Sequence, residues 1–425
     1  MSEPPVMTPT GAWPMATRIS APKFTFVTEE EPTSRLIVTI RKNPASDSAL
    51  ADIRNPSEFG CNFEGMLEDR LPGTESATIL PTLDHRFAIL TSPQGDEFPA
   101  ANRILARHGG PNGSVIAVEP DVLLRFSMPS VGLPFHLGGQ HNQYRSIMAV
   151  LTAYPSTTGG GVSVAVVDTG ADLQGVTDFY DVLNSSGPHP GLPSHDNDGH
   201  GTAMVRLIQA VAPGARIFVV RVADQPYATV VDTMAGVSVA MVDCQADIIN
   251  LSLGFPGFGT VCGLCGSSGT SRSIAFETIL RSLSKIKSGI YVAAAGNDAP
   301  KQTEFEYPGA YDFSVVVGSV NSHGDRSRFS QYRAAGGHKR YAMAPGGETD
   351  ASGNATEHVG TGSAHCFGTS VATAYFSGML ALFRAESRYQ GLTPDKFINA
   401  VLTQHCVPHS TGNITEYGHG IIRYS

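Results

Sequence analysis

The chain has 425 residues, which is enough for two or three domains. Hydrophobic residues make up 41% of it and charged residues 16%, so it can fill a sizeable core and is not disordered throughout. A net charge of −9 without a long basic run excludes a nucleic-acid-binding class. No apolar run is long enough to span a membrane, and residues 1–20 lack the layout of a secretory signal. We therefore expect a cytoplasmic protein, without a membrane partner, whose six cysteines are reduced.

The N-terminal part is predicted to contain a tail and a small domain. Residues 1–33 are rich in Pro, Thr, Ser and Glu and have no periodicity, which is typical of a disordered tail. Residues 34–127 are expected to form an α+β domain. Its expected elements are strands over residues 36–40, 86–90 and 114–118 and a helix over residues 100–107. A connector is expected at residues 128–144, followed by a short helix over about residues 144–153.

The remaining part, residues 145–425, alternates strand patterns with helix patterns. The strand patterns lie at residues 162–167, 215–222, 247–253, 290–295 and 313–320, and the helical patterns at residues 201–211, 231–243 and 271–287. Such alternation predicts an α/β fold with a doubly wound, mostly parallel sheet. Ligands of these sheets bind beyond the carboxyl ends of the strands, so residues that follow the strands are the first candidates for a site.

Three chemically active residue types stand at the ends of expected elements. Asp168 follows a β-branched strand run, His200 begins a helical pattern, and Ser370 opens a helix that is apolar on nearly every face. A serine hydroxyl becomes a nucleophile when a histidine accepts its proton and an acid orients that histidine. The chain order Asp, His, Ser is one of three orders known for such triads.

Five sequence blocks surround these residues in order: VVDTG at residues 166–170, HGT at 200–202, LSLG at 251–254, AAAGN at 293–297 and GTSVA at 368–372. In the same order they resemble the motifs of the subtilases, the subtilisin-like serine proteases. Smaller blocks at residues 329–330, 344–346 and 418–420 also resemble that family. Taken singly, each block has a structural explanation, such as a helix N-cap for Gly-Thr-Ser. The five together favour the catalytic interpretation.

The resemblance implies the roles of individual residues. Ser370 would be the nucleophile, His200 the general base and Asp168 the residue that orients His200, with an oxyanion hole at Asn297. Substrate binding is implied for Leu251, Ser252, Leu253, Gly254, Ala294, Ala295 and Gly296. The chain departs from the family pattern at Ala203, where many members have His, and at residues 373–375, where a Pro-containing segment is usual. Neither position takes part in proton transfer, and both indicate altered packing around two helices.

No cofactor is required by this chemistry. Calcium, which many subtilases hold, has scattered candidate ligands at Asp172, Asp178, Asp181, Asp196 and Asp198, but they lack a specific spacing and are expected to be solvated loop acids. Cys262 and Cys265 have metal-like spacing without a second pair, so free thiols are favoured over zinc. Cys366, close to Ser370, is the weaker candidate for the nucleophile.

The N-terminal domain resembles the inhibitory propeptide of the subtilases, because residues 118–121 (VEPD) end a small α+β unit. The resemblance implies a serine endopeptidase, made as a zymogen, that cuts its own chain at about residues 124–130 and is inhibited by its own N-terminal domain. Residues 122–128 are extended and apolar, which suits strand addition in a groove. The alternative for the domain is a permanent accessory unit.

Two alternatives for the function stay open. One is a protease that its N-terminal domain keeps silent until a regulatory protein displaces it, and the other is a transpeptidase or macrocyclase that uses the same acyl-enzyme. The substrate is expected to be a polypeptide. Glu277, which is expected to be helical, is the only acidic residue in the stretch 251–297, so the sequence predicts a weak preference for apolar or medium-sized side chains rather than basic ones.

Overall fold

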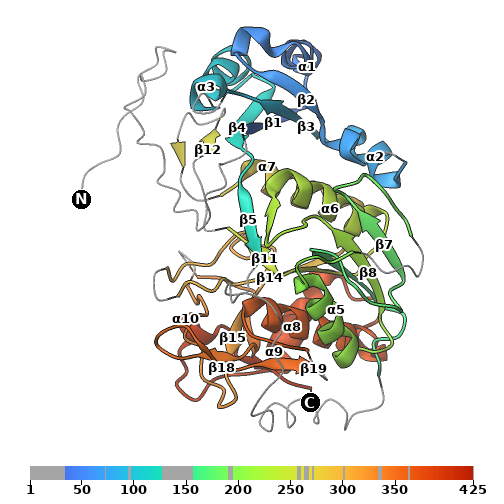
Figure 1. Cartoon of the computed structure of the whole chain (residues 1–425), viewed down its shortest axis with the longest axis vertical. Helices are drawn as coiled ribbons and strands as arrows, with labels where there is room; N and C mark the ends of the chain where they lie inside the picture. The colour runs from blue at the N-terminus through green and yellow to red at the C-terminus, as the bar shows by residue number, and fades with distance from the viewer. Residues whose placement is uncertain are drawn as a thin grey trace.

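The computed structural model describes residues 34–71, 73–93, 97–126, 157–189, 195–255, 260–262, 268–269, 272–299, 302–333, 337–361 and 364–424. The predicted tail, the predicted connector and the helix expected near residues 144–153 lie outside these residues. Figure 1 shows a small sheet at one end of the molecule and a larger α/β domain below it. None of the helices in the described part of the chain is long and apolar enough to cross a membrane.

The N-terminal domain is an antiparallel sheet with two helices on one face. Strand β1 (Arg35–Arg41) lies between β3 (His85–Thr91) and β4 (Val115–Pro120), and β2 (Asn62–Met66) pairs with β3. Alternate residues of these strands, such as Leu36 and Val38, form a core with α1 and α3. The two helices are α1 (Ser46–Arg54) and α3 (Glu97–His108). The three predicted strands and the predicted helix are confirmed, whereas β2 and α1 were not expected.

A nine-stranded sheet forms the larger domain, in the order β21-β22-β16-β15-β14-β10-β6-β8-β7. All its strand pairs are parallel except β21 with β22. The strands are β6 (Ser163–Asp168), β7 (Asp178–Asp181), β8 (Arg216–Arg221), β10 (Ile248–Leu251), β14 (Ile290–Ala294), β15 (Val315–Val320), β16 (Tyr341–Pro345), β21 (Cys406–Val407) and β22 (Ile421–Ile422). The predicted mostly parallel sheet is therefore confirmed.

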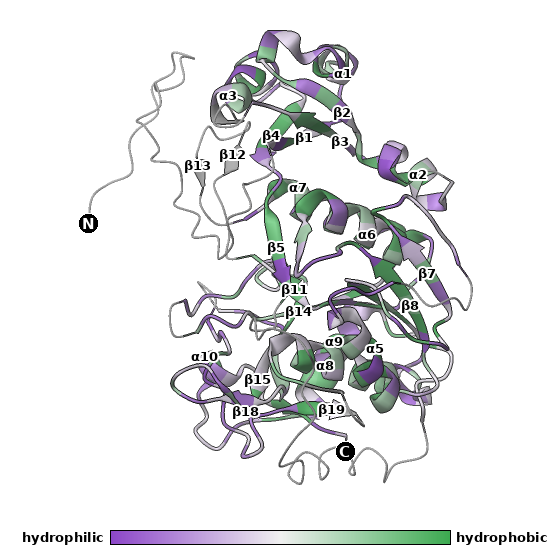
Figure 2. Ribbon diagram, viewed as in Figure 1, coloured by the Kyte–Doolittle hydropathy of each residue, from purple (hydrophilic) through white to green (hydrophobic). Residues whose placement is uncertain are grey.

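Helices cover both faces of this sheet, and the β-branched strands are buried between them (Figure 2). In β6, Val164 and Val166 face the core that contains α5 and α8, while Ala165 and Val167 face the core that contains α6 and α7. This explains why the strand sequence is a continuous apolar run rather than an alternating one. The helices in these two cores include α5 (His200–Val211), α6 (Val230–Val242), α7 (Ile274–Ile286), α8 (Thr369–Arg384) and α9 (Pro394–Gln404).

The N-terminal sheet packs its second face on the larger domain. Ile37, Phe87 and Ile89 share one hydrophobic core with residues of α6 and α7. In addition, β12 (Thr260–Cys262) pairs with β4, and β13 (Ser268–Gly269) pairs with β12, so a hairpin of the larger domain extends the N-terminal sheet to six strands. The two domains are therefore joined by side-chain packing and by backbone hydrogen bonds.

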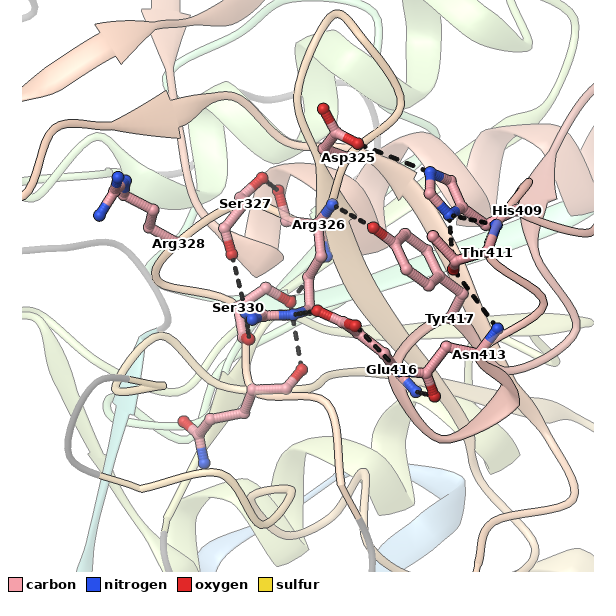
Figure 3. Close-up of polar contacts among 12 residues, drawn as sticks. Asp325, Arg326, Ser327, Arg328, Ser330, His409, Thr411, Asn413, Glu416 and Tyr417 are labelled. Atoms are coloured by element: carbon pink, nitrogen blue, oxygen red, sulfur yellow. Dashed lines mark hydrogen bonds and ion pairs between the residues drawn. The ribbon is translucent and has the colours of Figure 1, made fainter.

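A polar network fixes the C-terminal segment against the loop after β15 (Figure 3). The Arg326 guanidinium donates to Glu416 at 2.8 Å and to the backbone oxygen of Ser330 at 2.8 Å, and the Arg326 backbone amide donates to the Tyr417 hydroxyl at 3.1 Å. The His409 ring stacks on Tyr417 with 3.9 Å between ring centroids. The small family blocks at residues 329–330 and 418–420 thus border one structural network.

Candidate active site

Asp168 and His200 lie at the carboxyl edge of the parallel sheet. Asp168 is the last residue of β6, His200 is the first residue of α5, and His200 Nδ1 lies 2.7 Å from Asp168 Oδ1. Both side chains are buried. Burial by itself lowers the pKa of His200, but the charge and hydrogen bond of Asp168 outweigh it, so the pKa lies above its usual value. Burial raises the pKa of Asp168, while His200 and the Thr169 amide, at 2.8 Å, act in the opposite direction.

The loop before His200 is organised by Asp196. Its carboxylate accepts hydrogen bonds from Thr169 Oγ1 at 2.8 Å, from the Gly199 amide at 2.7 Å and from the Thr202 amide at 2.8 Å. A Cβ at Gly201 would lie 2.0 Å from the backbone oxygen of Gly170, so only glycine lets the helix start this close to the turn after Asp168. These contacts explain the local sequence on both sides of the Asp–His pair.

Ser370 is the second residue of α8 and is fully buried. Gly368 precedes the helix with φ +135°, a backbone conformation that favours glycine. The Ser370 hydroxyl donates to the backbone oxygen of Ser252 at 2.8 Å. His200 Nε2 has no hydrogen-bond partner among the described residues. The structure therefore pairs Asp168 with His200 and leaves the Ser370 hydroxyl bound to the backbone oxygen of Ser252, which follows β10 (Ile248–Leu251).

Asn297 lies beside the start of α8. Its side-chain oxygen accepts hydrogen bonds from the Thr369 amide at 2.9 Å and from Thr369 Oγ1 at 3.0 Å. Thr369 Oγ1 also lies 3.2 Å from the Gly296 amide, which donates to it. The residue that precedes Ser370 thus fixes the orientation of the Asn297 amide.

The residues expected to bind substrate lie on two neighbouring segments. Leu251 ends β10, Ser252 follows it, and β11 (Leu253–Gly254) comes next; Ala294 ends β14, and Ala295 and Gly296 follow it. All seven are buried. Since β10 and β14 are adjacent and parallel, their carboxyl ends place both segments at the same edge of the sheet.

The chain's own strand β5 (Leu123–Phe126) lies along β11 (Figure 1). It pairs antiparallel with β11 on one side and with β9 (Tyr227–Thr229) on the other, which makes a three-stranded sheet. The Phe126 ring packs 5.1 Å from the His200 ring, centroid to centroid. The predicted strand addition is confirmed for residues 123–126. Residues 127 and 128, which end the predicted segment, lie outside the described part of the chain.

Two acids of the N-terminal domain cap helices of the larger domain. The Glu119 carboxylate accepts hydrogen bonds from the Ser273 hydroxyl, from the Ile274 amide at 3.0 Å and from the Ala275 amide at 3.3 Å, all at the start of α7. Asp121 accepts from the Val231 amide at the start of α6, at 3.0 Å. Burial raises the pKa of each carboxyl to about 7, against the donors, which lower it.

The remaining candidates from the sequence are the acids considered as calcium ligands and the cysteines considered as metal ligands or as the nucleophile. Among the described residues no group of three or more His, Cys, Asp or Glu could hold a metal ion. Asp181 forms an ion pair with Arg221 at 2.7 Å, and Asp196 is saturated by the donors of its loop, so these candidates do not fit calcium. Burial raises the pKa of the Cys366 thiol to about 12, which argues against a nucleophilic thiolate. The Cys262 side chain and Cys265 lie outside what the structure describes.

Two parts of the site were not predicted from the sequence. Strand β9 forms the second wall beside β5, and Glu119 and Asp121 cap the helices of the other domain. Residues 227–229 carry no distinctive pattern. The sequence analysis singled out the VEPD block, but nothing in the sequence connected its two acids with the starts of α6 and α7, where Thr229 and Ser273 are the N-caps.

The comparisons with known proteins agree with this geometry. The family model described as "Subtilase family" matches residues 159–420, which is more than half of the chain. The chain belongs to the subtilase family. Subtilisin E of Bacillus subtilis (strain 168) is 30% identical over 288 residues, and M-protease of Shouchella clausii (strain KSM-K16) is 27% identical over 277 residues. Both matches cover 62% of this chain, and they span 65% and 63% of the two relatives.

A solved structure extends the likeness to the N-terminal part. Fervidolysin from Fervidobacterium pennivorans, described as a keratinolytic enzyme related to subtilisin, matches with a TM-score of 0.66 at 20% identity. The match covers 94% of this chain and 61% of that one. At this identity the likeness shows the fold: a subtilisin-like α/β domain together with a small antiparallel domain.

Proposed function

We propose that this subtilase is a serine endopeptidase that hydrolyses polypeptides through Asp168, His200 and Ser370. The observation that carries the proposal is the Asp168–His200 hydrogen bond of 2.7 Å. It lies beside β11, which already pairs with an extended segment of the chain, β5. Because Asp168 accepts from Nδ1, the neutral imidazole keeps its lone pair on Nε2, as a general base requires.

In the proposed mechanism Ser370 Oγ leaves the Ser252 oxygen, transfers its proton to His200 Nε2 and bonds to the substrate carbonyl carbon. Asn297 and the Ser370 amide stabilise the negative charge that develops on the carbonyl oxygen. His200 then gives the proton to the leaving amine, and the peptide bond breaks to form an acyl-enzyme. Water, deprotonated by His200, hydrolyses the ester and restores Ser370.

A fluorophosphonate probe tests this proposal. Processed wild-type protein should be labelled at Ser370 and should cut a denatured protein, and Ser370→Ala should do neither. Labelling of the variant equal to that of wild type, or no labelling of the processed wild type, would overturn the proposal.

The pairing of β5 gives the proposed position of self-cleavage. Phe126 is opposite Leu253, and Arg125 is opposite Gly254, so in a peptide bound in this register the residue after the one at the Phe126 position would be opposite Ser252. The Ser370 hydroxyl donates to the Ser252 oxygen at 2.8 Å, which supports a cut at this register position. We propose that the bond between residues 127 and 128 is cut. Wild type should then begin at Met128, whereas Ser370→Ala should keep all 425 residues; an active wild type that retains residues 34–127 would contradict the proposal.

The contacts of the N-terminal domain also support a gated form of the same enzyme. The strand pairing of β12 with β4 and the helix caps of Glu119 and Asp121 hold the domain independently of the groove. After the cut these contacts would keep the domain in place as an inhibitor. A cut but inactive complex, detected by intact mass and absence of labelling, would favour gating by a partner, and activity that appears with the cut would exclude it.

A further inference from the structure

One buried carboxylate at the peptide-binding edge has no role in the mechanism. Glu306 is 8% exposed, and its side chain lies between the two segments expected to bind substrate. A Cβ built on Gly254 would lie 2.7 Å from Glu306 Oε2, and a Cβ built on Gly296 would lie 2.9 Å from Glu306 Cδ. Each of the two segments therefore has a glycine, Gly254 or Gly296, at the position that contacts the Glu306 side chain.

The Glu306 carboxylate has neither an ion pair nor a hydrogen bond with any of the residues that the structure describes. Its backbone is fixed, because the Glu306 amide donates to the Ala295 oxygen at 3.1 Å and the Ala310 amide donates to the Glu306 oxygen at 2.8 Å. A buried carboxylate without a partner is costly, so a structure that holds one in place is prepared for a cationic ligand.

The chain's own strand β5 shows from which side that ligand would come. Arg125 Nη2 lies 3.5 Å from Asp298 Oδ1, and the charge of Arg125 also acts on Glu306. Phe126 turns the other way, toward His200. Because side chains alternate along a strand, the residue two positions after Arg125 in a bound peptide faces the side of Asp298 and Glu306. By the register given above, that residue is the one before the cut bond.

We propose that Glu306, with Asp298 at its rim, makes the enzyme select lysine or arginine as the residue before the cut bond in separate polypeptide substrates. The proposed cut in its own chain follows Ser127 instead, because an intramolecular cut has a high effective concentration and does not need the favoured side chain. This inference rests on the proposed function and adds a substrate class to it. It replaces the sequence-based expectation of an apolar preference, which considered acids only in the stretch 251–297. Glu306 lies beyond that stretch, and the fold brings it back to the same site.

The proposal also predicts a pH dependence. Burial raises the pKa of Glu306 to about 7; Asp298 raises it further and Arg125 lowers it. These two are the charged groups that act on Glu306 in the described structure, and Gln331, which contacts the position of Gly296, is neutral. Glu306 is thus ionised above about pH 7, and the preference for a cation should grow as the pH rises through that value.

The test uses processed enzyme and two peptides that differ only in the residue before the cut bond, lysine or its uncharged isostere norleucine. The ratio of their kcat/KM values cancels the titration of His200, which affects both. Wild type should favour lysine about 30-fold or more at pH 8, and the ratio should fall toward pH 6. Glu306→Gln should bring the ratio close to 1 at every pH, whereas Glu304→Gln, a half-exposed neighbour that pairs with Arg333, should leave it unchanged.

Fluorophosphonate labelling of Ser370 separates the two ways of failing. If wild type is labelled and cuts both peptides with a ratio near 1, or if Glu306→Gln keeps the wild-type ratio, the inference is wrong and the endopeptidase proposal stands. If the processed wild type is not labelled and cuts neither peptide, the proposed function and the inference both fall. Should Glu306→Gln lose labelling, Asp298→Asn provides the second variant, and it should lower the ratio without loss of norleucine cleavage.

Discussion

Glu119 of the N-terminal domain caps α7 of the larger domain, and removal of this cap should weaken the docking of the N-terminal domain. Glu119 is fully buried and accepts from one hydroxyl and two backbone amides at the helix start. In Glu119→Ala these three donors lose their acceptor and stay enclosed in the interface. We expect the cut domain to dissociate much faster from this variant.

The magnitude follows from the three hydrogen bonds. Each contributes about 1 kcal/mol net, so together they stabilise the docked domain by about 3 kcal/mol. This corresponds to a factor of about 100 in the dissociation constant. The hydrophobic contacts of Ile37, Phe87 and Ile89 and the pairing of β12 with β4 remain, so the domain should still dock, although weakly.

The assay follows hydrolysis of a fluorogenic peptide by the full chain after self-cleavage. Release of the domain sets the lag before full rate, and this lag should shorten about 100-fold in Glu119→Ala. Glu58→Ala is the matched control, because Glu58 lies on the same domain and pairs with Arg107, away from the interface. An unchanged lag in Glu119→Ala, or an equal shortening in Glu58→Ala, would refute the reasoning.

Four further outcomes are expected. Asn297→Ala should lower kcat by about 100- to 1,000-fold, the size of loss known for this kind of donor in subtilisin, while fluorophosphonate labelling slows but persists. The kcat/KM for the norleucine peptide should rise with pH through a pKa above 6.5, because His200 acts only when neutral and its pKa is raised; a rate that is flat or falling through this range would contradict the assignment. Inhibition by the docked domain should weaken as the pH rises from about 4.5 to 7, since Glu119 and Asp121 bind protons in the docked state that they have lost in the free state, and Glu119→Gln should reduce this dependence without abolishing it. In a Ser370→Ala background, Arg326→Ala should lower the free energy of unfolding in urea by about 2 kcal/mol, because it leaves two backbone oxygens and Glu416 without their donor, while the exposed Arg328→Ala should change it little (Figure 3).

The main elements of the larger domain were predictable from the sequence because their signals are local. A continuous β-branched run such as residues 163–167 indicates a strand buried on both faces, and the structure places its alternate residues in two different cores. The short elements β2 and α1 of the N-terminal domain and the strands β7, β16, β21 and β22 of the larger domain were missed, because segments of this length carry too few periods of a pattern.

The site was predictable only in part. The sequence blocks located Asp168, His200, Asn297 and Ser370, and the structure joins the first two directly. It did not follow from the blocks that the Ser370 hydroxyl would bind the Ser252 oxygen, because that contact joins residues on different elements, far apart in the chain.

The sequence by itself determined which residues can perform chemistry and five of the nine strands of the sheet, since motif spacing and β-branched runs act over a few neighbouring residues. Only the tertiary structure decided which charges meet at the peptide-binding edge. Glu306 reaches Gly254 and Gly296 because the chain returns to the ends of β10 and β14 after leaving them, and Glu119 reaches α7 because two domains pack together. Such contacts depend on burial and on backbone geometry between distant segments, and no local pattern of residues specifies them.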